Sequence, residues 1–136
     1  MATIFTKIIE GEIPCYKIAE DERFFAFLDI NPMSKGHTLV VPKQETDYIF
    51  DLDDTTLSEM IIFAKKIAKA VENAVPCKRV GLMVIGLEVP HAHIHLIPIE
   101  KEGDMNLANP RVKLTSLEFE EIAMNIRNKL WKKERD

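Results

Sequence analysis

The sequence predicts a single α+β domain over residues 1–136, with a sheet of about five antiparallel strands. Three observations lead to this fold class. The expected elements follow the order helix, three strands, helix, two strands, helix; neighbouring strands are of the hairpin type; and only two helices are long. A doubly wound parallel sheet is therefore not expected. Neither an internal repeat nor a Gly/Ser-rich linker divides the chain.

The first third of the chain is predicted to form a short helix and a β-hairpin. In IFTKIIEGEIP, apolar residues at helical spacing occupy one side of a short helix: Ile4, Phe5, Ile8 and Ile9. Pro14 ends this helix. The β-rich runs CYKIAED and RFFAFLDI are separated by the turn Asp21-Glu22, which indicates an antiparallel pair. After the loop NPMSKG, the run HTLVVP predicts a buried strand that Pro42 stops.

The rest of the chain is predicted to contain a long central helix, two strands and a C-terminal helix. The capping box TLSE begins at Thr56, and apolar residues recur at spacings of three and four until Pro76. The runs RVGLMVIGL and AHIHLIPIE follow as two strands. A second capping box, TSLE from Thr115, opens the last helix, whose apolar side is formed by Phe119, Ile122, Ala123, Ile126 and Leu130.

Composition excludes several classes of protein. Hydrophobic residues make up 46% and charged residues 29%, as in an average globular protein. The net charge of −4 argues against binding to nucleic acid. The longest apolar run has eight residues, too few to span a membrane, and Lys7 and Glu10 interrupt any export signal. Cys15 and Cys77 lack partners at metal-ligand spacing, so we expect a protein of the reducing cytoplasm.

Three of the four histidines alternate within the stretch HAHIHLI. Alternate residues of a strand share a face at intervals of about 6.6 Å, so His91, His93 and His95 are expected to lie side by side. One interpretation is that they are partly exposed strand residues without chemistry. A second is a metal site completed by Asp29, Glu88 or His37, although none of these has a diagnostic spacing.

The third interpretation is nucleophilic catalysis at phosphorus. A neutral imidazole is a nucleophile at pH 7, and its adduct with phosphorus is labile to water. Three protonated rings at this spacing would repel one another. The arrangement therefore favours a neutral middle histidine as nucleophile, with its neighbours donating hydrogen bonds to the phosphoryl oxygens.

The chain resembles the histidine triad (HIT) family over nearly its full length. HAHIHLI fits the family's His-φ-His-φ-His-φ-φ motif, where φ is apolar. IFTKIIEGEIP is similar to the family's N-terminal segment, and FLDINPMSKGHTLVVPK is similar to its stretch around a Gly-His pair. The resemblance implies a homodimer that hydrolyses the α-phosphate linkage of a purine nucleotide or nucleotide conjugate, without a metal or other cofactor.

The resemblance also implies roles for particular residues. His93 would be the nucleophile, His95 would contact the phosphate, His91 would fix the geometry of the nucleophile, and His37 would lie beside the triad. The expected nucleoside pocket comprises Asp29, which would bind the ribose hydroxyls, with Ile30, Phe5, Ile8, Ile13 and Phe27. Taken alone, the apolar members are typical of a core, and Asp29 is typical of a turn.

The chain departs from the family pattern at three places. Met83, Val84, Leu87 and Glu88 stand in the strand and shortened loop where the family commonly has polar, uncharged contacts to the phosphates and leaving group. Thr3 and Thr6 stand where some bacterial relatives have a zinc-binding Cys-x-x-Cys, so no structural zinc is expected. The nucleotidyl-transferase branch has Gln where this chain has His95, which favours hydrolysis over transfer.

The expected function is hydrolysis of nucleoside phosphoramidates or related conjugates through a nucleotidyl intermediate on His93. Three alternatives remain. The chain could be a nucleotide-binding or scaffolding dimer with little catalysis, a dinucleoside polyphosphate hydrolase, or a metal-dependent hydrolase. Trp131, apolar among charged residues, gives a further hint of a partner subunit.

Overall fold

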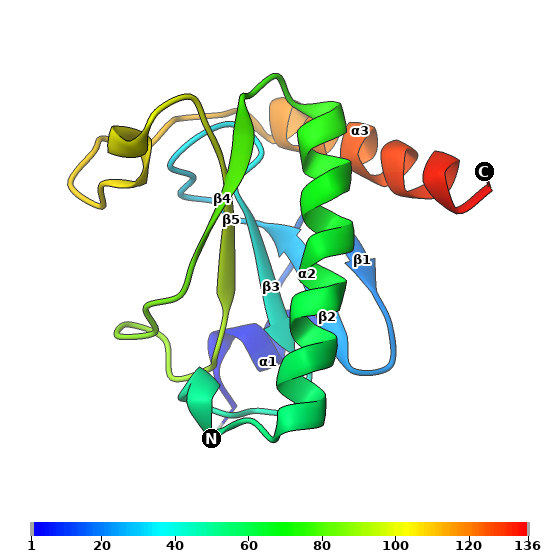
Figure 1. The fold of residues 1–136 in the computed structure, drawn as a ribbon, viewed down its shortest axis with the longest axis vertical. Coiled ribbons are helices and arrows are strands. Elements are labelled where there is room, and N and C mark those ends of the chain that lie inside the picture. The colour runs from blue at the N-terminus through cyan, green and yellow to red at the C-terminus, as the bar shows by residue number, and fades with distance from the viewer. Residues whose placement is uncertain (1, 136) are drawn as a thin grey trace.

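The structure is a computed structural model that describes residues 2–135, with side chains as far as residue 130. Its elements are α1 (Ile4–Ile9), β1 (Lys17–Glu20), β2 (Phe24–Leu28), β3 (Thr38–Pro42), α2 (Asp54–Ala74), β4 (Arg79–Met83), β5 (Ile94–Ile99) and α3 (Ser116–Arg135). Two short 3-10 helices, Ile49–Asp51 and Glu102–Met105, lie in the connections. This order confirms the predicted α+β class (Figure 1).

The five strands of residues 2–135 form one antiparallel sheet in the order β1-β2-β3-β5-β4. β5 therefore lies between β3 and β4, and His95 pairs with Leu39 on one side and Met83 on the other. β4 is at an edge of the sheet. His95 is consequently held between two paired strands.

The two faces of the sheet carry two separate apolar clusters. The main core packs α2 and α3 against one face, and Figure 1 shows α2 in front of the sheet. On β2, Phe24 and Leu28 point into this core, whereas Phe25 and Phe27 point to the opposite face. There they form a second cluster with Phe5 of α1, and each buried Phe side chain contributes about 1.5–3 kcal/mol. Strand alternation thus supplies two environments, of which the second will hold the histidines.

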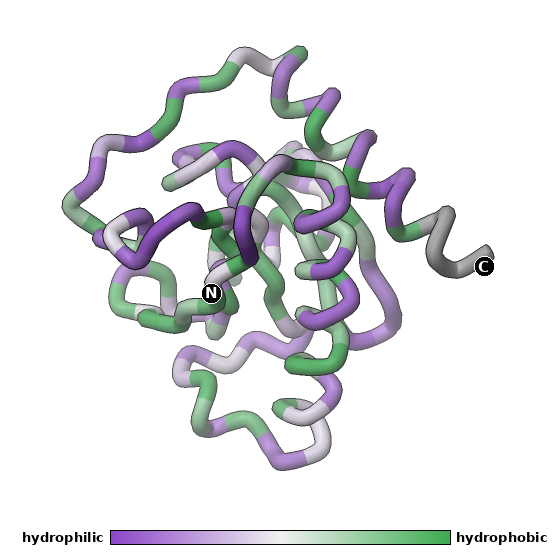
Figure 2. The backbone as a smooth tube through the Cα atoms, turned by 45° about the horizontal axis from the view of Figure 1, so that its top comes forward, coloured by the Kyte–Doolittle hydropathy of each residue, from purple (hydrophilic) through white to green (hydrophobic). Residues whose placement is uncertain are grey.

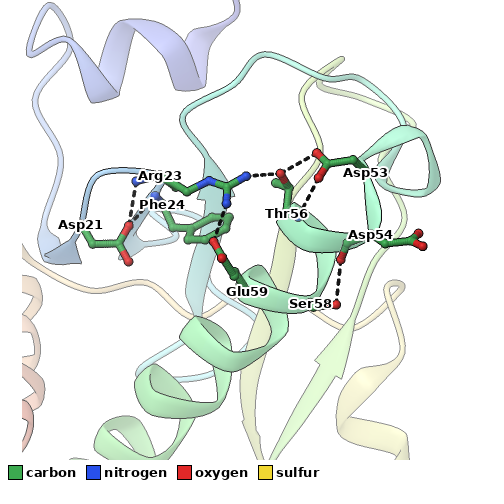
Figure 3. A network of polar contacts seen from close by, with 8 residues as sticks. All are labelled: Asp21, Arg23, Phe24, Asp53, Asp54, Thr56, Ser58 and Glu59. Atoms are coloured by element: carbon green, nitrogen blue, oxygen red, sulfur yellow. Dashed lines mark hydrogen bonds and ion pairs between the residues drawn. The ribbon is translucent and has the colours of Figure 1, made fainter.

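α2 begins earlier than its capping box predicts. The N-cap residue is Asp53, whose carboxylate accepts hydrogen bonds from the backbone N–H of Thr56 at 3.1 Å and from the Thr56 hydroxyl at 2.6 Å. Thr56 therefore lies inside the first turn, and the prediction of a start at Thr56 is wrong. Arg23, beside the hairpin turn, donates to Thr56 and to Glu59, which ties the β1–β2 hairpin to this turn of α2 (Figure 3).

α3 begins as predicted and is amphipathic. The Thr115 hydroxyl accepts from the backbone N–H of Glu118 at 3.1 Å, and the Glu118 carboxylate accepts from the backbone N–H of Thr115 at 3.0 Å. Hydrophilic and hydrophobic residues alternate along the helix (Figure 2). Among residues 116–130 of this helix, the buried side chains are Phe119, Ile122, Ala123 and Ile126. The Trp131 side chain lies outside the described residues. Within residues 2–135, no helix is both long and apolar enough to cross a membrane.

Candidate active site

The three alternating histidines lie on the α1 face of the sheet. β5 begins at Ile94, so the prediction of a strand from Ala92 is wrong at its start. The backbone of this segment bonds elsewhere, because Ala92 N–H donates to the carbonyl of Thr46 at 2.7 Å. The side chains nevertheless alternate: Ala92 and Ile94 enter the main core, while the rings of His93 and His95 lie together, with centroids 4.9 Å apart.

His93 is held in the form that a nucleophile requires. Its Nδ1 lies 2.7 Å from the carbonyl oxygen of His91, which can only accept, so Nδ1 carries the proton. In the neutral ring, Nε2 then has a free lone pair. The ring is 7% exposed and makes an edge contact with Phe5 at 5.0 Å between centroids. The orientation of His93 is therefore fixed by packing and by one main-chain hydrogen bond.

His37 and His95 form a pair whose proton positions follow from the backbone. The N–H of Met33 donates to His37 Nδ1 at 3.0 Å, so the proton of neutral His37 is on Nε2. That Nε2 lies 3.0 Å from His95 Nδ1 and donates to it, which leaves the proton of His95 on its own Nε2. Burial lowers the pKa of each ring to about 4, so both are neutral at pH 7. His95 can thus donate a hydrogen bond to a phosphoryl oxygen.

His91 does not face a substrate, because the protein satisfies both of its ring nitrogens. Nε2 donates to the carbonyl of Pro42 at 2.7 Å, and Nδ1 lies 2.7 Å from the Thr3 hydroxyl. The residue is 0% exposed, and burial lowers its pKa. This environment suits the expected role of fixing geometry, since the His91 carbonyl is the group that orients His93.

The metal alternative meets an obstacle at His37. Asp29, His37 and His95 offer ligand atoms that all lie within 4.8 Å of one another. A metal on His37 Nε2 would, however, require that nitrogen to lose its proton, and the Met33 N–H would then face a protonated Nδ1. Glu88, the other candidate ligand, is exposed on the loop before the triad. The hydrogen bonds therefore favour an interpretation without a metal at His37.

Only some of the residues predicted to bind the nucleoside lie next to the histidines. Phe5 contacts Phe27 edge to face with centroids 5.6 Å apart, and Ile8 packs against the same cluster. Ile13 is half-buried after α1, and Ile30 is 73% exposed. Asp29 is partly exposed, with one carboxylate oxygen accepting from the Asn31 N–H at 2.8 Å and the other 3.5 Å from His37 Nε2. The carboxylate oxygen of Asp29 that does not accept from Asn31 therefore faces the pair of His37 and His95.

A second pocket, of about 480 Å³, opens beside His93 on the side of the shortened loop. Its lining is mostly apolar and comprises Asp47, Tyr48, Ile49, Phe50, Leu57, Ile61, Val84, Ile85, Gly86, Leu87, Ala92 and His93. Leu87 is 89% exposed, and Glu88 is exposed as well. The loop therefore presents an apolar and a charged side chain, Leu87 and Glu88, where the resemblance implies polar, uncharged contacts to the leaving group.

Sequence reasoning missed the groups that orient the histidines. The Met33 N–H and the Pro42 carbonyl are main-chain atoms, which every sequence provides and no residue type signals. In the sequence, Thr3 stands out only by its place at a zinc-ligand position of some relatives, and no motif includes Glu45. A Thr at an N-cap position could have identified the start of α1, but not the contact with His91.

The chain is similar to proteins of one family. A model described as the HIT domain matches residues 10–102. Adenosine 5'-monophosphoramidase hnt1 of Schizosaccharomyces pombe is 35% identical over 133 residues, 96% of this chain and 99% of that protein. A solved HIT-like protein from Bartonella henselae has a TM-score of 0.80 at 34% identity, covering 93% of this chain and 95% of its own. A hypothetical histidine triad nucleotide-binding protein from Sulfolobus tokodaii has a TM-score of 0.82 at 30% identity, covering 96% and 93%.

Proposed function

This chain belongs to the histidine triad (HIT) family, and from that premise we propose that it hydrolyses the α-phosphate linkage of nucleoside phosphoramidates or related nucleotide conjugates. The observation that carries the proposal is the hydrogen bond from His93 Nδ1 to the His91 carbonyl, which leaves a lone pair on Nε2. The similarity to the adenosine 5'-monophosphoramidase of Schizosaccharomyces pombe supports a phosphoramidate substrate.

In the first step, His93 Nε2 attacks the α-phosphorus of the substrate. A nitrogen–phosphorus bond to His93 forms while the bond to the leaving nitrogen breaks, and the departing amine takes up a proton from water. Charge builds on the non-bridging oxygens, and His95 Nε2–H donates to one of them. Because His37 and His95 are neutral at pH 7, this stabilisation is by hydrogen bonding rather than by a fixed positive charge.

In the second step, water attacks the phosphorus of the nucleotidyl-histidine. The bond to His93 breaks, its electron pair returns to Nε2, and water loses a proton as the nucleoside monophosphate forms. The net reaction consumes one water and yields one amine and one nucleoside monophosphate. During both steps, Asp29 binds the ribose hydroxyls through the carboxylate oxygen that is not used by Asn31. A purine base lies against Phe5, Ile8, Ile13, Phe27 and Ile30.

The test is intact-protein mass spectrometry after rapid, acid-free quenching with adenosine phosphoramidate. Wild type is expected to gain one adenylyl group transiently, whereas His93→Ala gains none. Turnover by His93→Ala and by His93→Asn is expected to fall by on the order of 10⁴-fold or more, with unfolding midpoints close to wild type. Retained turnover in either variant would exclude His93 as the nucleophile.

A nucleotide-binding dimer with little catalysis is the second candidate. It is favoured by the apolar, exposed Leu87 and the exposed Glu88, which offer a leaving group few uncharged polar contacts. Tight binding of AMP, with neither adduct nor product from adenosine phosphoramidate, would favour this function. Faster cleavage of a dinucleoside polyphosphate than of the phosphoramidate would instead identify that polyphosphate as the preferred substrate.

The homodimer is also part of the proposal. β4 is an edge strand with unpaired backbone groups on its outer side, and Leu82 on it is 51% exposed. On α2, Ile61 is 45% exposed and lines the same pocket as Val84 and Ile85, which follow β4. A second copy pairing along β4 would cover both the strand edge and the exposed Leu82.

A further inference from the structure

The Thr3 hydroxyl joins helix α1 to the triad. Thr3 is the N-cap residue of α1, where its Oγ1 accepts from the backbone N–H of Thr6 at 3.1 Å. The same oxygen lies 2.7 Å from His91 Nδ1. Since His91 Nε2 donates to the Pro42 carbonyl, Nδ1 of the neutral ring must accept, and the hydroxyl proton of Thr3 must point to it. One hydroxyl therefore serves the helix and the histidine together.

Glu45 holds the two threonines in this arrangement. Its Oε1 accepts from the backbone N–H of Thr3 at 2.6 Å and from the Thr6 hydroxyl at 2.8 Å. The Thr3 hydroxyl also lies 3.2 Å from the Thr6 hydroxyl, but His91 Nδ1 at 2.7 Å is the closer acceptor for its proton. The hydrogen bonds from Thr3 and Thr6 lower the pKa of Glu45, so the carboxylate is ionised at neutral pH. We call Thr3, Thr6 and Glu45 the N-terminal clasp.

The clasp connects the expected base pocket with the nucleophile. α1 carries Phe5, whose ring makes edge contacts with His91 at 5.7 Å and His93 at 5.0 Å between centroids. His91 in turn supplies the carbonyl that keeps the proton on His93 Nδ1. A shift of His91 would therefore move both the orientation of His93 and the contact with Phe5.

We propose that Thr3 is a positioning residue, whose hydroxyl donates to His91 Nδ1, holds that ring against the Pro42 carbonyl and thereby orients the His91 carbonyl that fixes His93. Its effect on turnover rests on the function proposed above, whereas its hydrogen bond to His91 does not. Thr3 touches neither the substrate nor the reacting atoms. Its loss should therefore lower kcat more than it changes KM.

The test compares Thr3→Val, which removes only the hydroxyl function, with Thr3→Ser, which keeps it. Nitrogen-15 NMR of the histidine rings, recorded without substrate, reports whether the unprotonated Nδ1 of His91 accepts a hydrogen bond. Wild type and Thr3→Ser are expected to share the Nδ1 resonance of an acceptor, and Thr3→Val is expected to shift that resonance to the position of a nitrogen without a donor, while Pro42 keeps the proton on Nε2. The expected fall in kcat for Thr3→Val is on the order of 10-fold, less than the about 100-fold that a full ångström of misplacement costs.

Thr115→Val is the matched control, because it removes an N-cap hydroxyl from α3, away from the triad. It should leave both kcat and the His91 ring signals unchanged. Unchanged kcat and an unchanged His91 Nδ1 resonance in Thr3→Val would overturn the proposal, as would a Thr3→Ser protein that behaves like Thr3→Val. If wild type shows no turnover of phosphoramidate, the proposed function fails, but the ring signals still decide the role of Thr3.

Glu45→Ala provides a second variant if Thr3→Val does not fold. It removes the acceptor of the Thr3 N–H and the Thr6 hydroxyl without touching His91 directly. The Thr6 hydroxyl, no longer bonded to Glu45, can then form a different hydrogen bond with the Thr3 hydroxyl. The His91 ring signals should therefore shift and kcat should fall, as in Thr3→Val. Wild-type signals together with wild-type kcat in Glu45→Ala would overturn the proposal.

Discussion

Acidification is expected to destabilise the folded chain through His37, whose ring is 3% exposed. Burial lowers its pKa from 6.5 to about 4, with Asp29 opposing the shift and Arg111 and His93 adding to it. The unfolded chain therefore binds this proton more tightly than the folded chain, and protons favour unfolding. The stabilisation is fully present above about pH 6.5 and is lost progressively as the pH falls to 4 and below.

The size of the loss follows from the two pKa values. For one proton that binds with a pKa of 6.5 in the unfolded chain and about 4 in the folded chain, linkage gives a loss of about 2 kcal/mol at pH 5 and about 3 kcal/mol at pH 4. The measurement is the free energy of unfolding in urea at pH 7.5, 6 and 5, for wild type and His37→Asn. Asn is chosen because its side-chain oxygen can replace Nδ1 as acceptor of the Met33 N–H.

Wild type is expected to lose about 2 kcal/mol more stability than His37→Asn between pH 7.5 and pH 5. His95 is present in both proteins, and its pKa is lowered to about 4 chiefly by burial and also by His37, so the difference between the two curves reports His37 together with its effect on His95. Parallel curves would refute the reasoning. They would mean that the folded protein accommodates a protonated His37 and that its neutrality at the site is not enforced by burial.

Two further predictions concern the core and the edge strand. Ile67 is 0% exposed in the main core, so Ile67→Ala should lower the free energy of unfolding in urea by about 2–5 kcal/mol; a loss under 1 kcal/mol would contradict the packing described. Leu82→Lys places a charge on the exposed edge strand and should convert the proposed dimer to monomer in sedimentation velocity, whereas Leu107→Lys, on a 50% exposed leucine in the loop before α3, should not. A Leu82→Lys protein with the wild-type sedimentation coefficient would argue against pairing through β4.

The sequence predicted the fold well because side-chain periodicity reports which face of an element is buried. Phe24 and Leu28 alternate with Phe25 and Phe27, and the structure places the two pairs in opposite clusters. Errors are confined to the ends of elements. At α2, Asp53 and Thr56 are both good caps, and the earlier one bonds to the backbone of the later one. Residue type alone could not decide which of these two residues, three positions apart, is the N-cap of α2.

The candidate site also has a part that local sequence patterns predict and a part that they do not. Alternation placed His93 beside His95, and the structure brings the rings together even though the strand itself begins at Ile94. The contacts of His91 with Thr3 and Pro42 join segments 88 and 49 residues apart. No local pattern encodes such a contact. Ile30 likewise has the expected residue type, but its 73% exposure depends on the path of the loop after β2.

The proton positions of three histidines depend on main-chain atoms: the N–H of Met33 and the carbonyls of Pro42 and His91. A main-chain N–H is retained in every substitution except one to proline, provided that the backbone path is unchanged. Only proline at position 33 would therefore directly abolish the hydrogen bond from the Met33 N–H to His37. An alignment of relatives could therefore show many residue types at position 33 while the chemistry at His37 stayed constant. Variation at such a position would measure tolerance of the side chain and would understate the importance of the backbone beneath it.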